Sequence, residues 1–320
     1  MKDFLKIIPI PICGLILALV SLGNLLKTDG LTMFGNAVGL IGIALMCLVV
    51  FKIIFTFKHT LSHLSNHIVA SVAPTFTMAL MVICTYFLEF ESIRPHLSYI
   101  WLGVVFLQFF LMLYFAYFFL LKKTVKIHHV YPSWFIIFVG IGVISITSSN
   151  FYPEFGRWIF WVALSFYLVL LPIILYRVVR VKNMEESTLP LITIIAAPGS
   201  LCLTGYLNAF DNANIWLVTL LVVLSQGLYF IILTQLPKLL TIDFYPSFAA
   251  FIFPLVISAM ALTTTANFYT EQGYSVSLLH WVALAESSLA FFIVFYVLFK
   301  YVHYLMKQMK QHAVVRMQQM

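Results

Sequence analysis

The chain has 320 residues, of which 62% are hydrophobic and 9% are charged, and its mean hydropathy is +1.03. Soluble globular chains hold about 25% charged residues, so this composition excludes a soluble domain and indicates an integral membrane protein. The net charge of +7 falls in short loops and not on a folded basic surface, which argues against nucleic-acid binding and suits anionic lipid headgroups.

Ten apolar segments follow one another along the chain. Most have the roughly 20 residues that a helix needs to cross about 30 Å of hydrocarbon. The loops between them are short, so the sequence predicts one all-α transmembrane domain over 1–306 and a short basic cytoplasmic tail over 307–320. The segments, numbered 1 to 10 in order, are 4–26, 31–57, 67–88, 95–121, 132–150, 153–176, 188–210, 213–236, 244–268 and 276–305.

The positive charges alternate between the two ends of these segments. Of the 18 Lys and Arg residues, only Lys27, Arg94 and Arg157 lie in the odd-numbered loops; the other 15 lie at the N-terminus, in the even-numbered loops and towards the C-terminus. Lys and Arg concentrate on the cytoplasmic side of membrane proteins, so we expect both termini in the cytoplasm of a multi-pass plasma-membrane protein. A missed helix would disrupt the alternation, which therefore supports the count of ten.

The odd-numbered segments carry a weak repeat. Segments 5 and 9 begin with similar sequences, Tyr131-Pro132-Ser133-Trp134 and Tyr245-Pro246-Ser247-Phe248. This register aligns five positions that are 56 to 66 residues apart, with Gly14 within one turn of the first. Such a period corresponds to one helical hairpin per repeat. The aligned positions are Ile16, Pro74, Gly140, Pro198 and Pro254.

Proline within a membrane helix frees a backbone carbonyl that needs water or a protein donor, so helices with such breaks belong in the interior. Pro and Gly also occur as simple packing features in membrane helices, but their recurrence at one depth favours a shared role. We predict five inner helices around a central pore, surrounded by five outer helices. The predicted kink or lining residues are Gly14, Pro74, Thr75, Gly140, Pro198, Pro254 and Thr263.

The even-numbered segments differ in composition. Segments 4 and 10 are rich in Phe and Tyr and are predicted to face lipid. Segment 2 instead contains Gly35, Gly39 and Gly42, which favour close packing against a neighbouring helix or another subunit.

Phe253-Pro254-Leu255, Ala73-Pro74-Thr75, Ala197-Pro198 and the start Ile8-Pro9-Ile10-Pro11 resemble the tellurite-resistance/C4-dicarboxylate transporter family, which includes the plant guard-cell slow anion channels. The resemblance covers nearly the whole chain. It implies ten helices arranged as five hairpins with quasi-five-fold symmetry, a homotrimer as in bacterial members, and a pore plugged by Phe253. The chain departs from the family at Ile16 and Gly140, where members often carry further prolines.

The cores of the odd-numbered segments contain no Lys, Arg, Asp or Glu. This excludes a strong carboxylate site for cations and a relay of titratable groups along these helices. Hydroxyls and freed backbone N–H groups remain, and these can partly replace water around a weakly hydrated anion. A Phe253 gate would exclude water and ions; the alternative is an ordinary core aromatic.

Two further groups of titratable residues have open interpretations. Glu286 is the one carboxylate well inside a predicted span: it is a neutral carboxyl hydrogen-bonded to a neighbouring helix, a proton-coupling group, or a residue near the outer face of the membrane. His59, His63 and His67 would share a face on one continuous helix, but a turn is expected between them, so we predict no metal site.

The leading functional hypothesis is a channel or uniporter for small inorganic or carboxylate anions, embedded in the lipid bilayer and gated by Phe253. The second is a proton-coupled transporter of C4-dicarboxylates such as malate, or a tellurite-resistance transporter. A membrane enzyme or sensor is the third, and it lacks support because the sequence has no phosphate-binding loop or nucleophile–base motif. We expect no cofactor.

Overall fold

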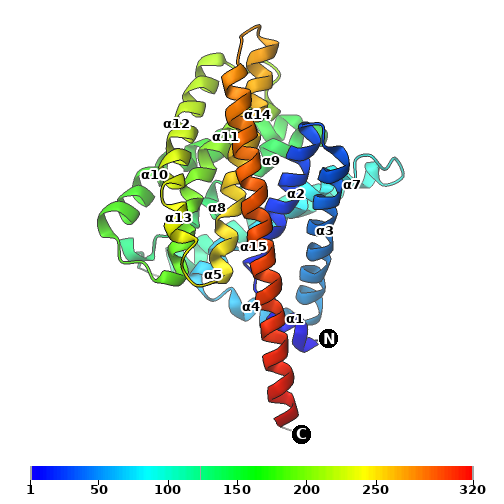
Figure 1. The fold of residues 1–320 in the computed structure, drawn as a ribbon, viewed down its shortest axis with the longest axis vertical. Helices are drawn as coiled ribbons and strands as arrows, with labels where there is room; N and C mark the ends of the chain where they lie inside the picture. The colour runs from blue at the N-terminus through cyan, green and yellow to red at the C-terminus, as the bar shows by residue number, and fades with distance from the viewer. Residues whose placement is uncertain (1, 123, 319–320) are drawn as a thin grey trace.

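A computed structural model describes residues 2–122 and 124–318, and the secondary structure of these residues is entirely helical. Eight helices among them are long and apolar enough to cross a membrane. Several combine an α-helix with a 3-10 or π segment, and both chain ends lie at the same end of the molecule (Figure 1). The eight are α3 (Thr32–Phe55), α5 with α6 (His67–Val72, Thr75–Tyr86), α7 with η1 (Arg94–Phe115, Ala116–Leu121), α10 with η4 (Pro153–Tyr176, Arg177–Val181), η5 with α11 (Glu186–Ala196, Ala197–Ala209), α12 (Ile215–Leu233), η6 with α14 (Pro246–Ala250, Ile252–Glu271) and α15 (Ser277–Gln318).

The other two predicted segments are interrupted. Segment 1 divides into α1 (Lys2–Ile7) and the 17-residue α2 (Ile12–Thr28), because two prolines separate them. Segment 5 divides into α8 (Trp134–Phe138), α9 (Gly142–Thr147) and η3 (Ser148–Asn150). Length alone thus identifies eight spans, and the count of ten crossings stays a prediction. Short helices connect the rest: α4 (Phe57–His63), η2 (Ile127–His129) and α13 (Leu236–Leu239).

A helix boundary lies within four residues of every aligned position of the repeat. Helices α6, α11 and α14 begin at Thr75, Ala197 and Ile252, next to the three prolines that the sequence singled out. Segments 1 and 5 lack a proline at the aligned position and are nevertheless interrupted, before α2 and before α9. Proline and glycine both disfavour an uninterrupted helix, so the two residue types mark the same kind of break.

Burial separates inner from outer helices. Within an apolar 18-residue stretch of each of the spans 67–86, 186–209 and 246–271, between 72% and 89% of the residues are buried, compared with 28% to 39% in the other five spans. Segments 4 and 10 are predicted to face lipid, but only some of their aromatic residues face outward. Phe106 and Phe292 are exposed, whereas Phe115 is buried and its ring packs edge-on against Trp134. Successive side chains point in different directions around a helix, so some of the aromatic residues of α7 face α8 and the others face outward.

The glycines of α3 pack within the chain. The carbonyl oxygen of Gly23 on α2 closely approaches Gly35, and the ring of Tyr86 on α6 lies against Gly39. The Tyr86 hydroxyl donates a hydrogen bond of 2.7 Å to the carbonyl oxygen of Val20. Of the two explanations for the glycines of segment 2, the structure therefore shows contact with neighbouring helices of the same chain.

Two basic residues near the end that carries the termini are buried. Lys52 Nζ donates hydrogen bonds to the carbonyl oxygens of Leu5 at 3.1 Å and Lys6 at 3.4 Å and so holds α1 against α3. Arg177 donates to the carbonyl oxygens of Lys182 and Asn183. These two charges support helix ends and connections, so the free positive charge at this end is smaller than the sequence suggests.

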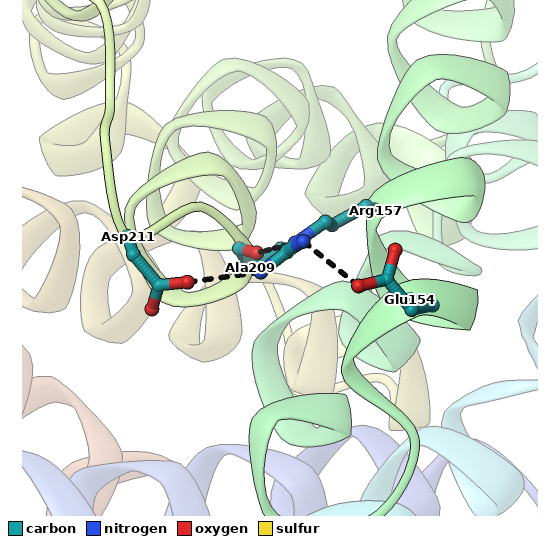
Figure 2. Close-up of polar contacts among 4 residues, drawn as sticks. All are labelled: Glu154, Arg157, Ala209 and Asp211. Carbon is teal, nitrogen blue, oxygen red and sulfur yellow. Dashed lines mark hydrogen bonds and ion pairs between the residues drawn. The ribbon is translucent and has the colours of Figure 1, made fainter.

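The other end has a paired arginine. Arg157 of α10 contacts Glu154 and Asp211 at 2.9 Å each, and its Nε donates to the carbonyl oxygen of Ala209 (Figure 2). These contacts join the start of α10 to the connection between α11 and α12. The charge of Arg157 is therefore balanced by two carboxylates.

Candidate functional site: a central cavity and a polar vestibule

Residues from all five odd-numbered segments meet at a small central cavity of ≈ 40 Å³. Gly14, Thr75, Gly140, Pro198 and Pro254 all line it, together with Phe253. The segments that provide them are far apart in the sequence, so their convergence results from the tertiary fold. Two predicted residues lie elsewhere: Pro74 is buried just before α6, and Thr263 on α14 lies outside the linings of this cavity and the two described next.

A second cavity, of ≈ 60 Å³, adjoins the first. Both are lined by Gly14, Thr75, Ile194, Ala249 and other shared residues. The second cavity also reaches Pro11 and Ile68, at the starts of α2 and α5, and therefore extends towards the chain termini.

A vestibule of ≈ 210 Å³ lies on the other side of Phe253, which is the residue that lines both this vestibule and the central cavity. The vestibule includes Thr28 at the end of α2 and therefore faces the end opposite the termini. Phe253 is partly buried at the start of α14, one residue before Pro254, and its side chain is thus part of the lining of both an apolar cavity and a polar one.

The vestibule is lined by neutral polar groups. Asn24 donates to Thr85 Oγ1 at 3.3 Å, and Asn208 donates to the carbonyl oxygen of Thr204 at 2.8 Å. Across the three cavities, the described lining residues are all uncharged. Hydroxyl and amide groups can hydrogen-bond an anion weakly without trapping it. The remaining polar lining residues are Ser21, Thr28, Thr147, Asn150 and Thr264.

Sequence reasoning missed Asn24 and Asn208. Each stands within about a turn of the end of an inner helix, α2 or α11. The sequence could have indicated them, because both are amide residues at the corresponding ends of two inner helices. The repeat analysis followed Pro and Gly near the middle of the segments and therefore did not reach them.

The three histidines of the 2–3 loop do not converge. His59 and His63 lie on α4 with their Nε2 atoms 3.4 Å apart, and burial together with the neighbouring ring lowers the pKa of His59. His67 begins α5 beyond a break in the helix, and its ring contacts Tyr131 instead. Among the described residues no group of three His, Cys, Asp or Glu side chains is placed to hold a metal ion.

Glu286 lies away from the cavities, on α15. It is 4% exposed, so it faces the protein interior and not lipid. Neither of its carboxyl oxygens has a hydrogen-bond partner. Gln226 of α12 and Ser258 of α14 lie close to this carboxyl, so the hydrogen bond to a neighbouring helix stays a prediction.

Two comparisons with known proteins bear on the family of this chain. The chain is 24% identical over 255 residues to an uncharacterised transporter from Methanocaldococcus jannaschii, a match that covers 68% of this chain and 70% of the relative. The family model described as SLAC1, voltage-dependent anion channel, matches residues 8–302. That family comprises membrane channels and transporters, not enzymes, and its substrates are anions. The chain is a multi-pass membrane protein that belongs to the SLAC1 voltage-dependent anion channel family.

Proposed function

We propose that this protein is an anion channel or uniporter that moves small inorganic or carboxylate anions through the central cavities and is occluded by Phe253. One observation carries the proposal: this Phe ring lines both the apolar cavity and the neutral polar vestibule. A large apolar ring at a narrow point excludes ions and water. An uncharged lining lets an anion leave as readily as it enters.

The proposal is tested by anion flux from proteoliposomes that contain the purified protein. We expect flux driven by an anion gradient alone, with no pH gradient, because the described lining has no titratable carboxylate to couple protons. Empty liposomes provide the control. Flux that appears only with a pH gradient contradicts a passive channel.

A proton-coupled carrier of C4-dicarboxylates, or a tellurite-resistance transporter, is the second candidate, and the buried carboxyl of Glu286 favours it. A carrier of this kind moves protons in a fixed ratio to the substrate. Malate added to proteoliposomes without a pH gradient would then acidify or alkalinise the lumen, which a fluorescent pH indicator detects. A passive channel leaves the lumenal pH unchanged.

We also propose that the chain crosses the plasma membrane ten times, as five hairpins with quasi-five-fold symmetry and cytoplasmic termini, and assembles as a homotrimer. Location of both termini at one end of the molecule supports an even number of crossings (Figure 1). The assembly is measured by light scattering of the purified protein, and a monomeric or dimeric mass contradicts the trimer.

The topology predicts which loops a membrane-impermeant thiol reagent reaches from outside. In a Cys47→Ser background, which removes the exposed native cysteine, Asp29→Cys between α2 and α3 should be labelled in intact cells. Thr241→Cys, in an exposed loop after α13, should be labelled only after the membrane is opened. The reverse pattern would show that the chain is inserted with its termini outside.

A further inference from the structure

A buried polar cluster lies between α12, α14 and α15, outside the three cavities. Glu286 of α15, Tyr229 of α12 and Ser258 of α14 are each at most 4% exposed. Gln226 Nε2 donates to Ser258 Oγ at 3.1 Å. The Glu286 carboxyl lies close to Gln226 and Ser258, and Tyr229 lies within electrostatic range of it. Three helices therefore bring their polar side chains to one place inside an apolar environment.

Several polar atoms of the cluster have no hydrogen-bond partner. Both carboxyl oxygens of Glu286, the Oε1 of Gln226 and the hydroxyl of Tyr229 have no hydrogen-bond partner. Buried polar groups without partners are rare and costly. A proton bound to Glu286 removes its charge and supplies an O–H donor that Gln226 Oε1 or the Tyr229 oxygen can accept. Proton binding thus removes an unpaired buried charge and adds one donor to the cluster.

The charged and titratable neighbours do not compensate a carboxylate here. Tyr229 is the titratable group of α12 that faces Glu286, and α14 presents the neutral Ser258. The titratable group of α2 near α15 is Cys13. It lies close to Tyr301, which is about four helical turns from Glu286, and therefore does not face the Glu286 carboxyl. Helix α1, with Asp3 and Lys6, lies beside the lower part of α15 near the termini (Figure 1). Among the described residues no cation is placed against Glu286.

We propose that Glu286, Gln226 and Tyr229 form a proton-binding site behind the pore wall, and that its charge state sets the rate of anion flux. The inference rests on the proposed channel function. Helix α14 carries Ser258 against this site and Phe253, Ile257 and Met260 against the vestibule. The site is therefore separated from the anion path by one helix, whose diameter is roughly 10 Å.

The sign of the effect follows from electrostatics. At low pH the site is neutral; at high pH its negative charge repels an anion in the pore. A unit charge at roughly 10 Å and an effective dielectric of about 20 changes an anion's occupancy on the order of tenfold. We expect flux to fall by about that factor as pH rises from about 5 to about 9, with equal pH on both sides of the membrane.

Infrared difference spectroscopy tests proton binding without any flux measurement. We expect one protonated-carboxyl stretch to persist at pH values where ordinary exposed acids are ionised, to disappear as pH rises further, and to be missing from that pH range in Glu286→Gln. Glu271→Gln, an exposed acid at the end of α14, is the matched control and should retain the signal. A spectrum in which Glu286→Gln leaves the pH-dependent signal unchanged overturns the site.

Flux tests whether the site acts on the pore. Flux should be independent of pH in Glu286→Gln and close to the low-pH value of the unsubstituted protein, whereas Glu271→Gln should keep the pH dependence. Glu286→Gln and Glu271→Gln are compared again in a Phe253→Ala background. An electrostatic effect on the anion should persist there, because it does not require the Phe253 ring. A pH dependence that survives Glu286→Gln in both backgrounds overturns the regulatory role. If Phe253→Ala fails to raise flux, the proposed gate is contradicted. The infrared titration does not depend on flux and still shows whether Glu286 binds a proton.

Discussion

Replacing Phe253 with Ala is expected to raise anion flux by at least roughly tenfold, the change that corresponds to a barrier lowered by about 1.4 kcal/mol. The substitution removes the ring that is part of the lining of the central cavity and of the vestibule, and no other described residue lines both. Stopped-flow or electrical measurement on proteoliposomes at matched protein density measures the effect. Phe253→Leu, which retains part of the apolar volume, should give an intermediate flux.

Phe110→Ala is the matched control for the gate. Phe110 is 56% exposed on α7 and faces the surroundings of the protein, so its removal opens no path between the cavities. Equal flux through Phe253→Ala and Phe110→Ala would contradict the gate. A rise in flux through Phe253→Ala together with loss of anion selectivity would indicate general loosening of the fold, and thermal denaturation of the purified variant distinguishes the two.

The second large effect is expected on stability, at the contact between α2 and α3. A Cβ atom at Gly35 would collide with the carbonyl oxygen of Gly23 and approach the Lys27 side chain within 2.8 Å. A backbone oxygen cannot move aside as a side chain can, so the two helices must separate. Overpacking of this kind costs about 1–3 kcal/mol. Gly35→Ala should therefore lower the melting temperature of the purified protein.

Gly103→Ala provides the control for this substitution. Gly103 lies within α7, and a Cβ atom there would meet nothing within 4 Å. Because Ala favours the helix over Gly by up to about 1 kcal/mol, this variant should be as stable as the original or slightly more stable. If both glycine variants melt alike, close packing of α2 on α3 does not contribute to stability in the way that we infer.

The sequence predicted the breaks in the inner helices well because their cause is local. Proline lacks a backbone N–H wherever it occurs, and Pro74, Pro198 and Pro254 each stand within three residues of a helix start in the structure. Gly14 and Gly140 line the central cavity, whereas Ile16 is fully buried in the core.

The sequence was less informative about side chains whose environment depends on several helices. Lys52 and Arg177 contribute to the charge count of the side with the termini, yet both are buried and bonded to carbonyl oxygens. Glu286 lies in an aromatic-rich segment that was assigned to the outer ring, yet it faces inward. Each turn of a helix has side chains that face the protein interior and side chains that face outward. Composition does not specify how the helix is rotated about its axis, and so does not specify which residues face inward.

Composition, segment length and the alternation of Lys and Arg by themselves determined that this chain is a multi-pass helical membrane protein with interior breaks. These properties follow from transfer of each segment into hydrocarbon and from local backbone chemistry, and they need no knowledge of which helices touch. Only the tertiary structure decided that Phe253 lines two cavities and that Gln226, Ser258 and Glu286 lie close together. The reason is that such contacts join helices distant in sequence, and packing alone fixes the rotation and depth of each helix against the next.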